Sequence, residues 1–307
     1  MLKHFLSIAE LTPAPLWNLL EAGLEAKKRS GNTTLGGKGL ALLFEKPSLR
    51  TRVSFEVAMR QLGGYCIYLS PAEVGLGKRE AATDVARVLS RYVDGIAART
   101  FSQGTVEELA AHATVPVINA LSNEEHPCQA LADLLTVYER KGRLKGTTIA
   151  FIGDANNVAN SLMLASAMVG AHFRIASPPA YGPRPPVWEK AQSWARSTGA
   201  IMASFTDPRE AAAGADVLYT DVWASMGQEG EAEIRRAAFA GYQVNPALVA
   251  LAQPDALLMH PLPAHYGEEV SLEVAASPQW VAWEQAENRL HAQKALLCHL
   301  LKGEETG

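Results

Sequence analysis

The sequence predicts an α/β protein with two doubly wound domains, each built on a parallel β-sheet. Its length of 307 residues suits one large domain or two of about 150 residues each. Short apolar runs alternate along it with segments of helical periodicity, which is the pattern of βαβ units. A polar break at 141–146 separates two such series and is a candidate domain hinge.

The first series has short apolar strands, as expected for a parallel sheet covered on both faces. The predicted strands are 40–44, 65–69, 95–98 and 115–118. A helix between the first two has Phe55, Ala58, Met59 and Leu62 on one face and ends at a pair of glycines. A further helix is predicted over 130–139.

The second series has predicted strands at 148–152, 173–176, 201–204, 217–220 and 256–259. We expect a loop from Pro178 to Pro186, because this stretch is too rich in proline for a helix or a central strand. The last predicted helix, 283–301, could pack on either half.

The composition is that of a packed protein, with 48% hydrophobic and 20% charged residues. A formal charge of −4 argues against nucleic acid or an anionic membrane as the main partner. Cys66, Cys128 and Cys298 form no disulfide framework, and we find no secretion signal and no apolar run near the roughly 20 residues that span a bilayer. We therefore expect a cytoplasmic protein.

The densest chemical signal is the segment 44–52, where a strand ends and a helix begins. The hydroxyls of Ser48 and Thr51, the cations Lys46, Arg50 and Arg52, and the first N–H groups of the helix would converge there. Such a helix N-terminus is a phosphate site by ordinary electrostatics. The alternative is a solvated helix cap.

The segment 126–129 follows a strand and precedes a helix. His126 and Gln129 could both donate a hydrogen bond to a carbonyl oxygen at this end of the sheet. The alternative is a capping histidine and a surface glutamine. Cys128 lies two residues from His126, but no second pair of ligands is near in sequence, so a metal site is not favoured.

Two later strand ends carry polar groups. The turn 151–157 lacks the glycine spacing of a dinucleotide loop, and Asn156 and Asn157 suit either a polar ligand or a simple turn. Asp221 could hold the ammonium group of a ligand, and 227–241 could be a mobile lid or an ordinary exposed loop.

The last two signals are weaker alone. Two prolines in the segment 259–265 indicate a rigid turn that could contain a cis bond. Arg289 could reach a ligand from the last helix, or form a surface ion pair.

Together these motifs resemble the ornithine carbamoyltransferases over nearly the whole chain. The shared elements are S-x-R-T-R at 48–52, HPxQ at 126–129, H-x-L-P at 260–263, and Asp221 followed by Ser225-Met226-Gly227. The first three mark carbamoyltransferases in general, and the last is typical of the ornithine branch.

The resemblance implies transfer of a carbamoyl group from carbamoyl phosphate to the δ-amine of L-ornithine, which gives L-citrulline and phosphate, without cofactor or metal. It implies a carbamoyl-phosphate-binding domain of residues 1–143, joined by the C-terminal helix 285–307, and an ornithine-binding domain of residues 144–284. The active site would lie in the cleft between them, and the protein would be a homotrimer or a multiple of trimers.

The resemblance also implies the site residues. Catalysis is expected from Arg50, Arg99 and His126, which would stabilise charge on oxygen. Carbamoyl phosphate would be bound by Ser48, Leu49, Arg50, Thr51, Gly75, Arg99, His126, Pro127, Cys128, Gln129, Pro261, Leu262 and Arg289. Ornithine would be bound by Asn157, Asp221, Ser225 and Met226.

Three positions depart from the family pattern. Leu49 and Gly75 stand where the ornithine enzymes often have Thr and Gln, and Pro261 stands where they usually have Cys. We expect the contacts of residues 261 and 262 to come from backbone carbonyls, held by a cis bond between Leu262 and Pro263.

Several alternatives remain at this point. Aspartate, putrescine or an N-acylated ornithine could be the second substrate, and Pro261 argues weakly for aspartate. A Rossmann-like NAD-dependent dehydrogenase shares the βα pattern but would need the missing glycine fingerprint. A non-catalytic subunit would be expected to lose Arg50, Arg99, His126 or Arg289, and all four are present.

Overall fold

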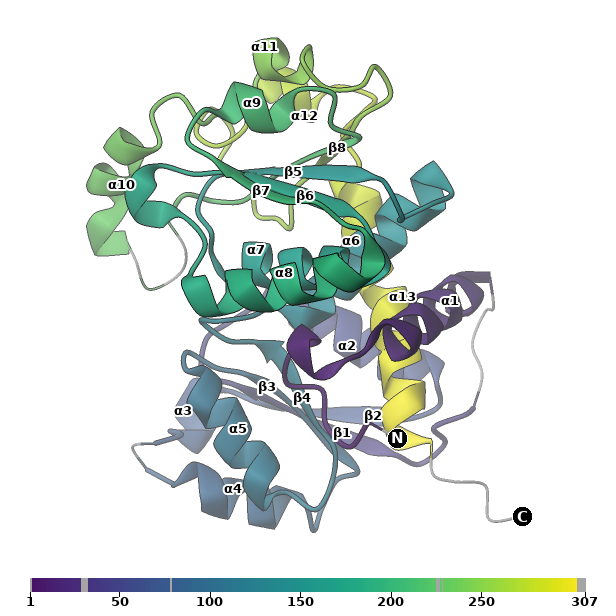
Figure 1. Ribbon diagram of the computed structural model, residues 1–307. Coiled ribbons are helices and arrows are strands. Elements are labelled where there is room, and N and C mark those ends of the chain that lie inside the picture. Colours follow the sequence, from purple (N-terminus) through teal and green to yellow (C-terminus); the bar gives the residue numbers. More distant parts are fainter. Residues whose placement is uncertain (1, 29–32, 78, 225–226, 228, 303–307) are drawn as a thin grey trace. The chain divides into compact units, whose positions relative to one another are not determined.

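The computed structural model describes residues 2–28, 33–77, 79–224, 227 and 229–302 (Figure 1). The chain forms two compact units, one of Met1–Leu135 with Glu287–Gly307 and the other of Thr136–Ala286. The unit boundaries fall inside two helices, α6 (Pro127–Lys141) and α13 (Ala282–Leu301). Each of these helices therefore has residues in both units.

The first unit contains a parallel sheet with strand order β2-β1-β3-β4. The strands are β1 (Gly39–Phe44), β2 (Tyr65–Leu69), β3 (Gly95–Arg99) and β4 (Val117–Leu121). Every residue of β1 is buried, so its sequence is a continuous apolar run and does not alternate. The strand predicted from residue 115 begins at Val117, because Pro116 has no N–H to donate to the ladder.

The helices of the first unit cover both faces of this sheet. They are η1 (Ile8–Glu10), α1 (Pro13–Lys28), α2 (Leu49–Gln61), α3 (Pro71–Val74), α4 (Ala82–Leu89) and α5 (Gln103–His112), with parts of α6 and α13. Buried residues of α4 and α5, such as Ala86 and Leu109, pack with Ile96 on one face. On the other face a Cβ atom on Gly95 would come within 2.9 Å of Leu301, so α13 lies close against β3.

The second unit contains a parallel sheet with strand order β7-β6-β5-β8-β9. The strands are β5 (Thr148–Ile152), β6 (His172–Ala176), β7 (Met202–Phe205), β8 (Val217–Thr220) and β9 (Leu257–Met259). The prediction of two α/β domains with parallel sheets is therefore confirmed.

The helices of the second unit also lie on both faces of its sheet. Figure 1 shows α7 (Asn157–Val169) and α8 (Pro185–Thr198) on one face, and α9 (Pro208–Ala212), α11 (Pro246–Val249) and α12 (Leu272–Ala275) on the other. The remaining helices are η2 (Pro179–Tyr181), η3 (Glu229–Glu231) and α10 (Ala232–Ala238). The loop prediction for Pro178–Pro186 was wrong at both η2 and α8, because proline is well tolerated in the first turn of a helix.

Strand order determines where each sheet can bind a ligand. In the first unit the chain passes from β1 to one neighbour, β2, and then to the opposite neighbour, β3. In the second unit the corresponding reversal lies between β5 and β8. Ligands of open α/β sheets bind at such switch points, beyond the carboxyl ends of the strands. Those ends are Phe44 and Arg99 in one unit and Ile152 and Thr220 in the other.

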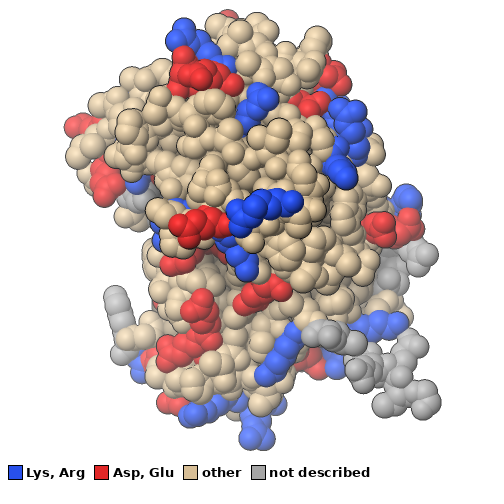
Figure 2. Space-filling model, viewed as in Figure 1, with Lys and Arg blue, Asp and Glu red and all other residues tan. Residues whose placement is uncertain are grey.

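On the face shown in Figure 2, acidic and basic side chains are interspersed. Within the described residues, no helix is long and apolar enough to cross a membrane.

Candidate active site

The N-terminus of α2 lies at the switch point of the first unit. Ser48 caps this helix, and its Oγ accepts a hydrogen bond from the backbone N–H of Thr51 at 3.3 Å. A capped helix keeps other first-turn N–H groups that have no acceptor within the helix, and these attract anions. Leu49 is the first residue of the helix and is 75% exposed, so its contribution to an anion site would come from its backbone N–H and not from its side chain.

Arg289 reaches this helix terminus from α13. Its Nη2 donates to Oγ1 of Thr51 at 3.2 Å, and its Nη1 donates to Oε1 of Gln129 at 2.7 Å. Gln129 donates in turn through Nε2 to Oδ1 of Asp133 at 2.8 Å. All four side chains are buried, so Arg289 does not form the surface pair that was the alternative for it.

The cations around this point affect one another's pKa. Burial lowers the pKa of Arg99 to about 10, and the charges of Arg289 and Arg50 add to the effect. The pKa of Lys46 falls to about 8, through burial and then the charge of Arg99. Burial and the same cations hold the pKa of His126 well below its ordinary value. The result is a buried positive field beside a neutral imidazole, which suits an anion and a hydrogen bond to a polarised oxygen.

The other residues expected to bind carbamoyl phosphate lie on several different elements. Gly75 ends α3 in the left-handed region, at φ 60°, and its backbone bonds go to Pro71 and Arg79. The thiol of Cys128 is buried and donates to the carbonyl of Asn119 at 3.5 Å, and burial raises its pKa to about 12. Its side chain therefore faces β4. Pro127 is the first residue of α6, and Pro261 and Leu262 belong to the second unit.

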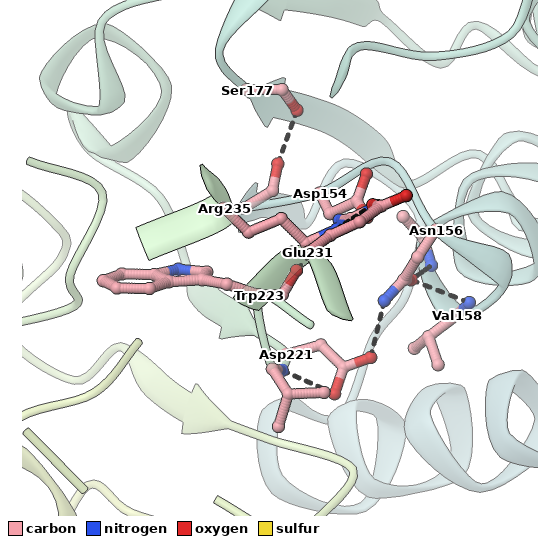
Figure 3. A network of polar contacts seen from close by, with 11 residues as sticks. Asp154, Asn156, Val158, Ser177, Asp221, Trp223, Glu231 and Arg235 are labelled. Atoms are coloured by element: carbon pink, nitrogen blue, oxygen red, sulfur yellow. Dashed lines mark hydrogen bonds and ion pairs between the residues drawn. The ribbon is translucent and has the colours of Figure 1, made fainter. Parts of the chain in front are cut away.

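Two polar residues meet at the switch point of the second unit, as Figure 3 shows. Asn156 caps α7, because its Oδ1 accepts from the N–H groups of Val158 at 3.0 Å and Ala159 at 3.1 Å. Its Nδ2 donates to Oδ2 of Asp221 at 2.7 Å, and the other oxygen of Asp221 accepts from the N–H of Val222 at 2.8 Å. Burial raises the pKa of Asp221, and these two hydrogen bonds oppose the rise.

An ion-pair network holds the chain that follows Asp221. Arg235 of α10 contacts Asp154 at 2.8 Å and Glu231 at 3.1 Å, and donates to the carbonyl of Trp223 at 2.9 Å (Figure 3). Its guanidinium also lies over the ring of Tyr181, at 5.0 Å from the centroid. Much of the segment 227–241, which was predicted as a lid or an exposed loop, is helical in η3 and α10. The ion pair of Arg235 with Asp154 connects it to the turn between β5 and α7. The predicted ligands Ser225 and Met226 lie outside the described residues.

The turn after β9 has the predicted cis bond. The Leu262–Pro263 peptide is cis, so this prediction is confirmed, and Leu262 itself has a positive φ of 58°. The N–H of Leu262 donates to Nδ1 of the buried His260 at 2.8 Å. The other ring nitrogen of His260 contacts Oε1 of Glu269 at 3.1 Å.

One group of possible metal ligands lies among the described residues. His265, Glu268 and Glu269 have ligand atoms within 4.8 Å of one another. Glu268 is paired with Arg236 at 3.0 Å, and Oε1 of Glu269 already accepts from His260 and from the N–H of His265. These contacts explain the group without a metal ion.

Three residues around these sites were not anticipated from the sequence, and a fourth, Asn156, was noted there without its contact to Asp221. Asp133 could have been found, because it lies four residues after Gln129 on the same helix, where side chains are neighbours. Arg235 and Glu269 gave no signal, because their partners Asp154 and His260 lie 81 and 9 residues away. Asn156 did give one, since asparagine before a helical segment is a preferred cap. A capping asparagine has its amide nitrogen left to orient a neighbour, here Asp221.

Comparisons with known proteins agree with this arrangement. Residues 3–139 match the family model of the carbamoyl-P binding domain of aspartate/ornithine carbamoyltransferases, and residues 145–300 match that of the Asp/Orn binding domain. The chain is 53% identical to an ornithine carbamoyltransferase of Anoxybacillus flavithermus over 303 residues, or 97% of this chain and 96% of that protein.

Solved structures are similar over the same extent. An ornithine carbamoyltransferase from Pyrococcus furiosus superimposes with a TM-score of 0.95 and 49% identity, covering 99% of this chain and 98% of that one. An N-acetyl-L-ornithine transcarbamylase mutant gives a TM-score of 0.89 at 32% identity, over 97% and 100% of the two chains. From its fold, its motifs and its similarity along the whole sequence, the chain belongs to the aspartate/ornithine carbamoyltransferase family.

Proposed function

We propose that this protein transfers the carbamoyl group of carbamoyl phosphate to the δ-amine of L-ornithine and releases L-citrulline and phosphate. The observation that carries the proposal is the buried cluster of Arg99, Arg289 and Lys46 at the capped N-terminus of α2. Burial, and then the charges of neighbouring cations, lower the pKa values of Arg99 and Lys46, and a multiply charged anion would offset both effects. The ornithine carbamoyltransferases among its relatives support the choice of substrates.

Within the first unit the groups divide between the two ends of carbamoyl phosphate. Ser48, Arg50, Thr51 and Arg99 are proposed to bind the phosphate, together with the first N–H groups of α2, including that of Leu49. A neutral His126 has one ring N–H to donate to the carbamoyl oxygen. Gln129 gives one hydrogen of its amide to Asp133 and keeps a second for the same oxygen.

In the second unit Asp221 is proposed to pair with the α-ammonium group of ornithine. Asn156 and the N–H of Val222 hold its two oxygens in place, which orients the carboxylate before a ligand arrives. Asn157, Ser225 and Met226 are proposed to contact the same amino acid. The carbonyls of Pro261 and Leu262 are proposed to accept the N–H groups of the carbamoyl amide.

The reaction then needs positioning and charge stabilisation. The lone pair of the neutral δ-amine attacks the carbamoyl carbon and forms the new C–N bond. The C–O bond to phosphate breaks, and phosphate departs with its electron pair toward Arg50 and Arg99. A free primary ammonium has a pKa of about 10.4, so the amine gives up one proton to solvent on binding. After the attack the nitrogen gives a second proton to the departing phosphate.

The test is an assay of ureido products from carbamoyl phosphate with ornithine, aspartate, putrescine and N-acetylornithine. We expect ornithine to have by far the highest kcat/KM, with citrulline identified by mass spectrometry. A higher kcat/KM with another amine would reassign the second substrate, and no ureido product with any of them would refute the function. Arg50→Ala should lose most of the activity, because a charge-assisted contact to phosphate is lost.

Aspartate is the second candidate substrate, favoured by Pro261 in the H-x-L-P element. The buried carboxylate of Asp221 argues against aspartate. The single amine of aspartate would be the nucleophile, so it has no second ammonium group to pair with Asp221, and its carboxylates would be repelled there. Asp221→Asn should therefore impair ornithine use far more than carbamoyl phosphate binding, which calorimetry with carbamoyl phosphate alone would show.

We also propose that the protein acts in the cytoplasm as a homotrimer or a multiple of trimers. Exposed apolar side chains on α2 and β2 support association, since Leu49, Val53, Tyr65 and Ile67 are 75%, 46%, 49% and 42% exposed. Light scattering coupled to gel filtration would give the mass, and a monomer at assay concentration would contradict the proposal.

A further inference from the structure

The turn that follows β9 rests on a buried pair of side chains, His260 and Glu269. Both are fully buried, and Nε2 of His260 lies 3.1 Å from Oε1 of Glu269. The same oxygen of Glu269 accepts the backbone N–H of His265 at 2.6 Å. Nδ1 of His260 accepts the backbone N–H of Leu262 at 2.8 Å. The pair therefore holds the turn at two points.

These contacts determine the tautomer of His260. A ring nitrogen that accepts an amide N–H carries no proton, so Nδ1 is unprotonated. Nε2 must then carry the ring proton, and it donates that proton to Glu269. The carboxylate of Glu269 thus selects the form of His260 that can accept from Leu262.

The turn has few backbone N–H groups of its own. Pro261 and Pro263 have no N–H groups. His260 and Glu269 accept the N–H of Leu262 and that of His265, which are two of the few donors in this segment. Leu262 is the one non-glycine residue with positive φ in the described part of the chain. A leucine persists in this region only when its surroundings hold it there.

We propose that His260 and Glu269 are positioning residues, which hold the backbone of Leu262 so that the carbonyls of Pro261 and Leu262 face the carbamoyl amide. This inference rests on the proposed function, because it takes carbamoyl phosphate as the ligand of those carbonyls. Neither side chain touches the substrate. They act through two backbone hydrogen bonds, from Leu262 to the imidazole and from His265 to the carboxylate.

Two substitutions of His260 separate this role from simple packing. In His260→Asn the amide oxygen is bonded to Cγ, as Nδ1 is in histidine, so it can still accept from Leu262. In His260→Gln the amide lies farther out, near the place of Nε2, and the acceptor for Leu262 is lost. His265→Ala is the control, because it removes an exposed imidazole from the same loop and keeps the N–H that bonds Glu269.

We expect His260→Gln to lower kcat/KM by at least about tenfold, the effect of one lost hydrogen bond, and to raise the Kd of carbamoyl phosphate in calorimetry. His260→Asn should lose markedly less and His265→Ala almost nothing, with thermal midpoints recorded for all three. Equal loss in the Asn and Gln variants, after correction for the folded fraction, would overturn the proposal.

A second measurement uses the unmodified protein and stays informative if the variants do not fold. Nitrogen-15 NMR of histidine-labelled protein should show His260 with a protonated Nε2 and an unprotonated Nδ1. A protonated Nδ1 would overturn the proposal without any assay. Failure of the wild type to form citrulline would instead refute the proposed function, and the NMR result would still decide the tautomer.

Discussion

Replacement of Asn156 tests whether one side chain both caps a helix and orients the carboxylate that we propose binds ornithine. Its amide oxygen accepts from two N–H groups of α7, and its amide nitrogen donates to Asp221 at 2.7 Å. Asn156→Ala removes both roles. Asn156→Ser keeps a good capping residue but is too short to reach Asp221.

The two roles have different expected energies. Loss of a capping side chain costs about 1 kcal/mol. Loss of a hydrogen bond to a charged group costs about 1.5–3 kcal/mol. The free energy of unfolding should therefore fall by about 2.5–4 kcal/mol in Asn156→Ala, and by about 1.5–3 kcal/mol in Asn156→Ser.

The pH dependence of this loss has a definite sign. Burial raises the pKa of Asp221 above its value in the unfolded chain, and the bond from Asn156 opposes that rise. Without the bond the pKa of Asp221 rises further. In the folded variant this carboxylate therefore stays protonated up to a higher pH than in the wild type. The free energy of unfolding that the variant loses should thus be smaller at about pH 5 than at about pH 8, where Asp221 must ionise without its partner.

Urea unfolding of the three proteins at both pH values provides the stability data, and steady-state kinetics provides the functional data. We expect KM for ornithine to rise in both variants while the Kd of carbamoyl phosphate is unchanged, because the residues proposed to bind its phosphate lie in the other unit. If Asn156→Ser is as stable as the wild type at both pH values, the contact with Asp221 contributes nothing and the reasoning is wrong.

Three further results are expected from the first unit. Arg289→Met removes the donors to Thr51 and Gln129. Calorimetry should then show the Kd of carbamoyl phosphate raised at least about tenfold. An unchanged Kd would exclude Arg289 from the site. Lys46 loses its proton around its pKa of about 8. Inorganic phosphate should therefore bind more weakly above that pH in the wild type, but not in Lys46→Arg. The same decline in both proteins would contradict a role of Lys46 as a cation for phosphate. The thiol of Cys128, buried and with a pKa of about 12, should resist iodoacetamide in the folded protein and react after denaturation, as mass spectrometry would show; rapid labelling of the native protein would contradict its placement against β4.

Much of the fold could be predicted from local patterns. A continuous apolar run such as 40–44 becomes a strand buried on both faces, and Ser48 before an amphipathic segment becomes a helix cap. The errors came where proline was treated only as a breaker. At Pro116 it delayed the start of a strand, and at Pro185 it began a helix.

The chemical groups could also be anticipated, since hydroxyls, cations and amides at strand ends are local features of the chain. Their partners could not, because contacts across the fold depend on strand order and helix packing. Arg289 meets Thr51 from 238 residues away, and Asn156 meets Asp221 across a separation of 65. The pKa of Arg99 and that of His126 likewise depend on burial among cations from other elements. Residue types thus indicated which chemistry was available, while the strand order of each sheet decided which side chains share a site, because both sites form where that order reverses.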